Sequence, residues 1–270
     1  MRILLTVITM LIFVLPAHAK QSAYDRVMET GQIRCGFLTW PPMQYEDLNM
    51  GEMAGPISDY AAALAEALNF ELVWAEELNL STYLADLNAG RYDVECAGGW
   101  PTPERAKRVI YLQPVFFVPY YIYVRGDDAR FDAIADLNAE NVTMAIMDGE
   151  NTSQLRDHMF EDTQSVEVPG NGQVSDLILS VTTGKADFTA LDTLSAHQFL
   201  ENNQGEIKPI GAPVHMIPIS LSVAQGEVAL KEMLETTTNL MLYNGEIDRI
   251  LDKYDPERKF YKRRQPAFEE

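Results

Sequence analysis

The chain has 270 residues, of which 21 are lysine or arginine and 40 are aspartate or glutamate, so its net charge is -19. This length is sufficient for two domains and a large core. The excess of acidic groups argues against a nucleic acid or an anionic membrane surface as a partner, although it could also serve only to keep an exported protein soluble.

The first 19 residues have the pattern of a secretory signal peptide. A positive charge at Arg2 precedes an apolar run, and Ala17 and Ala19 provide small residues where a signal peptidase would cleave. The apolar run is short for a membrane anchor, which needs about 20 residues, and no cysteine stands at the cleavage site to carry a lipid. We therefore expect residues 1–19 to be removed and the rest of the chain to be exported as a soluble protein.

The first third of the exported chain predicts strands and helices in alternation. Apolar periodicity indicates these elements at 32–38 (strand), 57–68 (helix), 70–74 (strand), 80–88 (helix) and 92–97 (strand). The prolines at 41–42 cannot continue a strand, so 39–45 is expected to be a loop. A β-α-β-α-β order implies parallel pairing with right-handed crossovers.

The strongest functional signal lies in the stretch 92–125. Glycines at 98–99 let the backbone turn after a strand. The sequence Thr-Pro-Glu at 102–104 is typical of a helix start, with a hydroxyl cap, a proline at the first position and an acid in the first turn. Arg105 would then lie about one turn into a short helix at the carboxyl end of a strand, where open α/β sheets bind ligands. The apolar run 114–125 is too long for an ordinary strand and is expected to pass from one sheet to another.

The second half of the chain predicts a second α/β unit and a return to the first. Apolar periodicity indicates strands at 142–147 and 165–168, a helix that ends at about 160, and helices at 174–183 and 193–200. The chain then returns to the first unit through 208–210 and 217–223. It closes with helices at 228–242 and 246–254. The segment 148–153 begins a helix, where free backbone amides attract a carboxylate. Asp192 stands just before another predicted helix, in a position suited to an N-cap.

The stretch 92–125 resembles the motif DxxxAG…TPER…V.F..P of the family 3 solute-binding proteins of polar amino-acid ABC transporters. The resemblance continues in GKADFTALD at 184–192 and in the closing helix at 244–254. It implies the type II periplasmic binding protein fold, an α/β architecture of two Rossmann-like lobes with mixed, mainly parallel sheets joined by two crossing hinge strands. The implied division is 1–19 signal peptide, 22–117 plus 217–265 lobe 1, and 118–216 lobe 2.

The resemblance also implies a ligand site. Arg105 matches the arginine that clamps the ligand α-carboxylate, and Asp192 matches the acid that accepts the α-ammonium. Trp40 occupies the place of an aromatic residue that packs on the ligand side chain. Thr152 is the best match to the threonine that follows a glycine at a helix start, and Trp100 stands where the family usually has a serine or threonine that bonds the ligand head group.

Two departures from the family pattern bear on the ligand. Members that bind basic amino acids carry an acid in the first strand where this chain has Phe37, so lysine, arginine and histidine are disfavoured. Trp100 cannot accept a hydrogen bond through its side chain, and with Trp40 it suggests a flat or apolar ligand portion. Structural alternatives stay open, because both tryptophans could be packing residues, and Thr152 and Asp192 could be only helix caps.

These observations predict a periplasmic solute-binding protein, not an enzyme, that delivers a small carboxylate-bearing ligand to an ABC permease in the inner membrane. We expect a monomer without a cofactor or metal. Two alternatives remain: an enzyme similar to the periplasmic cyclohexadienyl dehydratases, with Glu95 or Glu150 as the candidate general acid, and a ligand sensor that signals to a membrane receptor. The histidines of the exported chain are scattered, so neither a metal site nor a catalytic triad is indicated.

The chain contains two cysteines, Cys35 and Cys96, in strands that are neighbours in the resembled fold. An oxidising compartment permits a disulfide between them. Two buried thiols are equally compatible with the sequence, because a disulfide requires a geometry that sequence does not provide.

Overall fold

The computed structural model describes residues 21–263; the predicted signal peptide lies outside them. The helices are α1 (Ala23–Thr30), α2 (Pro56–Ala67), α3 (Tyr83–Ala89), α4 (Pro103–Ala106), α5 (Asn151–Met159), α6 (Val174–Thr182), α7 (Thr193–Asn202), α8 (Val228–Tyr243), α9 (Glu246–Tyr254) and the 3-10 helix η1 (Ile134–Leu137). The strands are β1 (Gln32–Phe37), β2 (Tyr45–Asp47), β3 (Glu52–Ala54), β4 (Glu71–Glu77), β5 (Val94–Gly99), β6 (Val109–Tyr111), β7 (Phe116–Arg125), β8 (Thr143–Met147), β9 (Gln164–Val168), β10 (Phe188–Asp192), β11 (Ile207–Ala224) and β12 (Lys262–Arg263).

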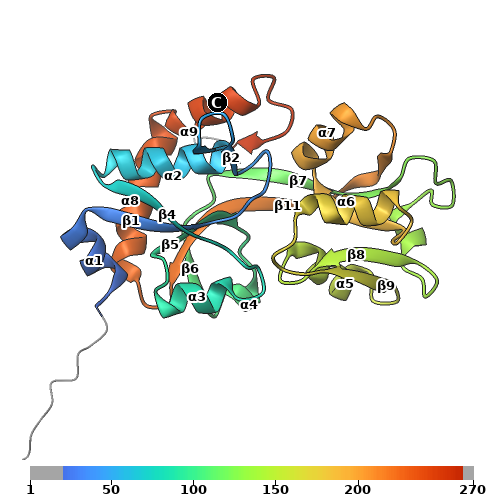
Figure 1. Cartoon of the computed structure of the whole chain (residues 1–270), viewed down its shortest axis with the longest axis horizontal. Helices are drawn as coiled ribbons and strands as arrows, with labels where there is room; N and C mark the ends of the chain where they lie inside the picture. The colour runs from blue at the N-terminus through green and yellow to red at the C-terminus, as the bar shows by residue number, and fades with distance from the viewer. Residues whose placement is uncertain (1–20, 264–270) are drawn as a thin grey trace, which may run out of the picture.

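The elements form two α/β lobes that are joined by β7 and β11 (Figure 1). The strand order is β4-β1-β5-β11-β7-β10-β8-β9, with β6 paired to β11 and β12 paired to β7. In lobe 1, β1 runs parallel to β4 and β5; in lobe 2, β8 runs parallel to β9 and β10. The crossing strands β7 and β11 run antiparallel to each other. The structure therefore confirms the predicted mixed α/β fold of two lobes joined by two crossing strands.

The return across the hinge differs from the prediction in one respect. The chain was expected to return through 208–210 and 217–223, whereas β11 is one strand of 18 residues that includes both segments. Its pairing with β7 shifts between Ile210 and His215, and Gly211 within this irregularity has a φ of +67°. A bulge of this kind bends a strand without ending its ladder, so β11 continues through a stretch whose glycine and prolines suggest a break.

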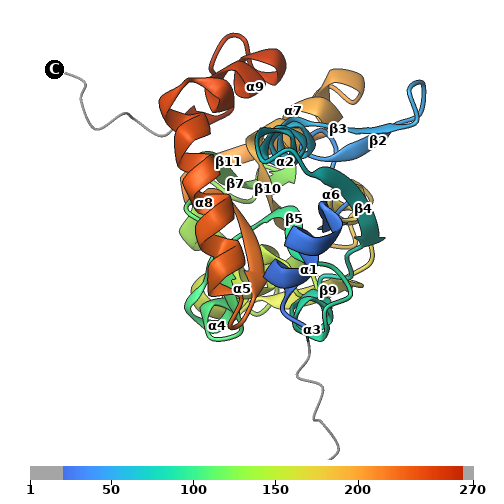
Figure 2. The same cartoon turned by 90° about the vertical axis from the view of Figure 1, so that its left-hand side faces the viewer.

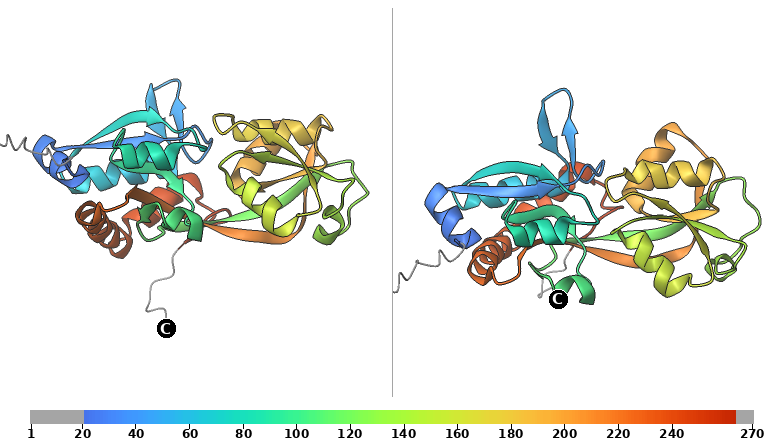
Figure 3. Two further views of the ribbon diagram at one scale, coloured as in Figure 1. Left: turned by 90° about the horizontal axis from the view of Figure 1, so that it is seen from below. Right: turned by 60° about the horizontal axis from the view of Figure 1, so that its bottom comes forward.

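The helices cover the faces of the sheets, as the end-on view of lobe 1 in Figure 2 and the views from below in Figure 3 show. In α2, the apolar residues at helical spacing, such as Ile57, Ala61 and Leu64, are buried as predicted. Asp59 of the same helix bonds Lys253 Nζ at 2.8 Å and the Tyr254 hydroxyl at 2.9 Å, which fastens α2 to α9. Asp59 therefore has a structural role.

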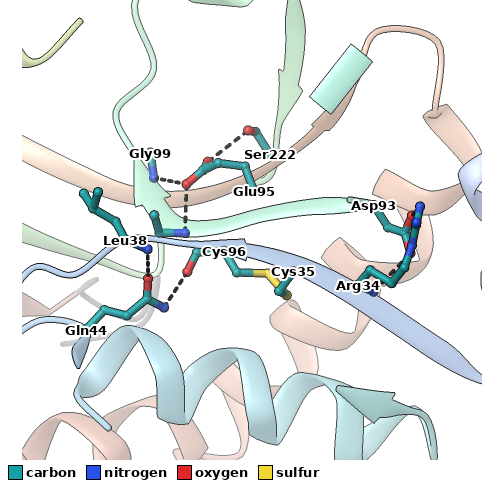
Figure 4. Close-up of a disulfide and its surroundings, with 10 residues drawn as sticks. Arg34, Cys35, Leu38, Gln44, Asp93, Glu95, Cys96, Gly99 and Ser222 are labelled. Atoms are coloured by element: carbon teal, nitrogen blue, oxygen red, sulfur yellow. Dashed lines mark hydrogen bonds and ion pairs between the residues drawn. A yellow bond between two sulfur atoms is a disulfide. The ribbon is translucent and has the colours of Figure 1, made fainter. Parts of the chain in front are cut away.

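Cys35 and Cys96 form a disulfide between the adjacent strands β1 and β5 (Figure 4). Their Cα atoms are 5.4 Å apart, and both residues are buried in the core of lobe 1. The structure thus decides between the two alternatives that the sequence left open. The bond ties together the two strands whose carboxyl ends lead into the loops described next.

Candidate functional site

A cavity of about 810 Å³, part of it open to solvent, lies between the two lobes. Lobe 1 contributes the loop after β1, the carboxyl end of β5 and helix α4. Lobe 2 contributes the beginnings of α5 and α6 and the end of β10. The cavity therefore lies at the carboxyl ends of the parallel strands of both lobes, which is where ligands bind in open α/β sheets.

The lobes contact each other around this cavity. Arg105 Nη2 of lobe 1 donates to the Gly149 carbonyl of lobe 2 at 2.7 Å. Trp40 Nε1 donates to Asp192 Oδ2 at 3.2 Å. Leu80 N donates to the Gly170 carbonyl at 2.9 Å. A molecule held in the cavity would thus be enclosed by groups from both lobes.

Arg105 is held by the helix start that the sequence predicted. The Thr102 hydroxyl accepts the Arg105 backbone N–H at 3.2 Å, and Pro103 occupies the beginning of α4. Within the guanidinium, Nη1 donates to the Trp100 carbonyl at 3.0 Å and Nη2 donates to Gly149. An arginine has five N–H groups, so these two bonds leave donors for an anion in the cavity that Arg105 lines.

Asp192 lines the cavity from lobe 2 and also caps α7. Its Oδ1 accepts the backbone N–H groups of Leu194 at 3.1 Å and Ser195 at 2.8 Å. Burial raises the pKa of the Asp192 carboxyl, and these donors oppose that rise. The cap role suggested as an alternative is therefore real. The ammonium-binding role stays a prediction. The two roles are compatible because the cap uses Oδ1, whereas Oδ2 faces Trp40.

Both predicted tryptophans line the cavity. Trp40 Nε1 reaches Ser195 Oγ at 3.2 Å in addition to Asp192, so this ring bridges the lobes. Trp100 stacks on His215 of β11 with ring centroids 4.4 Å apart and meets the edge of the Tyr120 ring at 6.2 Å. These rings give the cavity flat, apolar walls next to its few charged groups.

Thr152, the fifth predicted site residue, does not reach the cavity. It is fully buried, its Oγ1 accepts Met147 N at 2.9 Å, and its hydroxyl donates to Glu150 Oε2 at 2.7 Å. The cavity wall at this point is formed by Glu150 and Asn151 instead. The inserted acid explains the difference: Glu150 takes the N-cap position of α5, so the threonine behind it supports the cap.

Glu95 lies on β5 and lines the cavity, and Figure 4 shows its side chain beside Gly99 and Ser222. Its Oε1 accepts the backbone N–H groups of Ala97 at 2.9 Å and Gly99 at 3.1 Å, and its Oε2 accepts the Ser222 hydroxyl at 3.0 Å. The side chain is 1% exposed. Burial raises the pKa of the Glu95 carboxyl to about 7, while the three donors and the charge of Arg105 oppose the rise.

The charges around the cavity are unequal. Among the described residues that line it, Arg105 is the one cation, whereas Glu95, Glu150 and Asp192 are acids. Within residues 21–263, no group of three or more acids, histidines or cysteines could hold a metal ion. The described lining therefore presents one guanidinium and three carboxyl groups to the cavity.

Comparison with known proteins identifies the family. The model of the bacterial extracellular solute-binding proteins, family 3, matches residues 33–257, nearly the whole described chain. The chain belongs to this family. This solute-binding protein is thus one of a class of extracellular proteins. In the part of the chain that the structure describes, no helix has both the length and the apolar character needed to cross a membrane.

Individual relatives are distant. A Sinorhizobium fredii protein named "Probable amino-acid ABC transporter periplasmic-binding protein y4tE" is 28% identical over 60% of this chain and 54% of that protein. The arginine-binding extracellular protein ArtP of Bacillus subtilis is 20% identical over 80% of this chain and 82% of its own. The crystal structure of an ancestral amino acid-binding protein, described as a precursor of cyclohexadienyl dehydratase, has a TM-score of 0.76 at 22% identity and covers 86% of this chain and 99% of that chain. Such a structural likeness shows the fold alone.

Some residues of this solute-binding protein's cavity were not predicted from the sequence. Tyr83 and Asn151 line the cavity but carry no motif, and the buried Oδ1 of Asn151 has no hydrogen-bond partner among the described residues. Glu95 was considered only as the acid of an alternative enzyme. Its position within a predicted buried strand could have indicated a special role, because a glutamate is seldom fully buried without a partner.

Proposed function

We propose that this solute-binding protein captures a small zwitterion, an amino acid or a close relative, between its lobes and delivers it to an ABC permease of the inner membrane. The observation that supports the proposal is that Arg105 and Asp192 line one cavity from opposite lobes. A zwitterion leaving water needs both charges paired. A guanidinium suits a carboxylate through two parallel bonds, and a carboxylate suits an ammonium.

This arrangement also couples binding to lobe closure. Arg105 and Asp192 reach the same ligand only when the lobes are together, so the ligand binds the closed state more strongly than an open one. Hinge closure around a ligand is an established response of two-lobed proteins. A permease could then distinguish loaded from empty protein. We propose that the division into lobe 1 (22–117 plus 217–265) and lobe 2 (118–216) describes the moving units, in a monomer that is exported to the periplasm after removal of residues 1–19.

The walls of the cavity favour a ligand with an apolar or flat remainder. Beside the two tryptophans, the apolar side chains that line it include Leu38, Leu78, Leu80, Met147, Leu177 and Leu191. Phe37, which stands where family members for basic amino acids have an acid, packs edge-on against Trp74 with ring centroids 6.1 Å apart. Neither ring is among the residues that line the cavity, so the first strand offers a basic side chain no acid at that position.

A thermal-shift screen tests this proposal. The exported protein, from which residues 1–19 are absent, is mixed in turn with the twenty standard L-amino acids and with small carboxylates that lack an amine. A ligand at about a hundredfold its dissociation constant adds about 2.7 kcal/mol to the free energy of unfolding, which raises Tm by about 5–10 °C for a protein of this size. We expect the largest rise with an amino acid that has an apolar or aromatic side chain. If no amino acid raises Tm, the proposal is wrong.

One observation favours a second function, an enzyme on the same fold. A buried carboxyl with a pKa of about 7, such as Glu95, is suited to general acid catalysis near neutral pH, and it lies in the same cavity as Arg105. The test is incubation of the protein with prephenate or arogenate, followed by detection of the aromatic product. Absence of product with either substrate would leave the binding protein as the function of the site.

A further inference from the structure

The acids of the cavity exceed the charges that a zwitterion would pair. In the proposed complex the ligand carboxylate takes Arg105 and its ammonium takes Asp192. Glu150 is stabilised where it stands, because its Oε2 accepts the N–H and the hydroxyl of Thr152, both at 2.7 Å, at the start of α5. Glu95 then remains as a buried acid whose nearby cation has been taken by the ligand.

Of the described cations, Arg105 is the one whose charge acts to lower the pKa of Glu95, while Arg108 acts on the neighbouring Tyr83. The titratable groups that face Glu95 from the packed elements are Tyr83 of α3, Tyr92 before β5, Arg105 of α4 and Tyr111 of β6. Burial raises the pKa of each of these tyrosines above its ordinary value, so all three are neutral at physiological pH. β11 contributes only the Ser222 hydroxyl. Within residues 21–263, Arg105 is therefore the cation that balances a Glu95 carboxylate.

The backbone beside Glu95 is shaped around its carboxyl group. A Cβ atom on Gly99 would lie 2.5 Å from Glu95 Oε2, so the carboxyl group would have to move from its present position. The glycine thus leaves room for the carboxyl at the cavity wall, where Glu95 is 1% exposed. A proton is small enough to reach a carboxyl group in so closed a position.

We propose that the site takes a proton as a second ligand, which binds Glu95 when a ligand carboxylate occupies Arg105. This inference rests on the proposed function. Before binding, the Glu95 carboxylate and the Arg105 guanidinium balance each other. The ligand brings a second anion to the same guanidinium beside a buried carboxyl group, where charges interact strongly. A proton from solvent that binds a Glu95 oxygen removes the excess negative charge.

The hydrogen bonds of Glu95 accommodate this proton. Oε1 accepts two backbone N–H groups, which cannot become acceptors, so it stays unprotonated. Oε2 bonds only the Ser222 hydroxyl, which can rotate from donor to acceptor. The O–H bond therefore forms at Oε2 and donates to Ser222. Because the pKa of Glu95 is already raised to about 7, a further anion nearby moves it above neutrality, and net uptake occurs near pH 7 to 8.

Calorimetric titration measures the proton directly. The probe is the amino acid with an uncharged side chain that raises Tm most in the thermal-shift screen, titrated at pH 7.5 in phosphate and in Tris, buffers with different enthalpies of ionisation. We expect uptake that approaches one proton, and an affinity that falls by up to about tenfold per pH unit above neutrality. Glu95→Gln should bind the probe with no uptake attributable to this site and with a flat pH profile. The matched control Glu150→Gln should retain the uptake.

The outcomes separate the two proposals. Binding of an uncharged amino acid without proton uptake, or with uptake that Glu95→Gln retains, would overturn this inference and leave the proposed function intact. Binding of basic amino acids alone would also overturn it, because the ligand would then supply the missing positive charge. If none of the twenty amino acids binds, both proposals fail together.

Discussion

Replacing Arg105 by alanine is the most direct test of the site. Arg105 is 9% exposed and lines the cavity, and its guanidinium bonds the carbonyls of Trp100 and Gly149. In the variant, a ligand carboxylate would leave water without a cation to receive it. Truncating one partner of a buried, hydrogen-bonded charge pair costs about 2–5 kcal/mol, which is roughly thirty- to several-thousand-fold in dissociation constant.

The shape of the side chain adds a second, finer expectation. Arg105→Lys keeps the charge but loses the planar fork that bonds a carboxylate at two points. It should therefore recover only part of the lost affinity. The bond from Arg105 to Gly149 joins the two lobes, so both variants should also weaken lobe closure, which affects binding in the same direction.

The assay is isothermal titration of the amino acid found in the thermal-shift screen, with a matched arginine variant as control. Arg249→Ala removes a surface arginine of α9 that pairs with Glu246, away from the cavity, and it should bind as the wild type does. Far-ultraviolet circular dichroism should show that Arg105→Ala keeps its secondary structure. If folded Arg105→Ala binds with wild-type affinity, Arg105 does not hold the carboxylate.

Three further predictions concern the acids and the disulfide. Asp192→Asn should weaken the binding of amine-bearing ligands but not of simple carboxylates in the same titration. The helix should stay intact, because the amide oxygen still caps α7. Equal loss of affinity for both classes would contradict an ammonium site. The native pKa of Glu95 is raised from 4.5 to about 7, so the native state binds this proton more tightly than the unfolded chain. The stabilisation that this proton gives is complete below about pH 4.5 and is lost as pH rises toward 7, by up to about 1.4 kcal/mol per pH unit. Glu95→Gln should remove this pH dependence of the free energy of unfolding, measured by urea unfolding at several pH values. An unchanged pH dependence would assign the effect to another group. Cys35 and Cys96 are 61 residues apart, so reducing their disulfide should lower the free energy of unfolding by about 4 kcal/mol, the entropy of closing that loop. The measurement is the urea midpoint with and without dithiothreitol. An unchanged midpoint would contradict the loop-closure argument.

Local sequence was sufficient wherever neighbouring residues control the structure. The capped start of α4 depends on Thr102 and Pro103, which stand next to each other, and the cap of α7 depends on Asp192 directly before it. Helical spacing in α2 indicated which of its residues are buried. The alternation of strands and helices predicted parallel pairing within each lobe. The fold and the positions of Arg105, Asp192 and the two tryptophans followed from these local patterns together with the family motif.

Tertiary structure decided what depends on residues far apart in the chain. Thr152 supports a cap and Glu150 lines the cavity because the inserted acid, whose Oε1 accepts the Tyr120 hydroxyl, takes the N-cap position of α5. Glu95 becomes a cavity acid through Ser222, which lies 127 residues later, and through the space that Gly99 leaves. The spacing of residues along a chain determines which face of a helix or strand they share. The pKa of a carboxyl group depends instead on the donors, cations and solvent that the fold places around it, and for Glu95 the donors and the cation come from three elements, β5, β11 and α4.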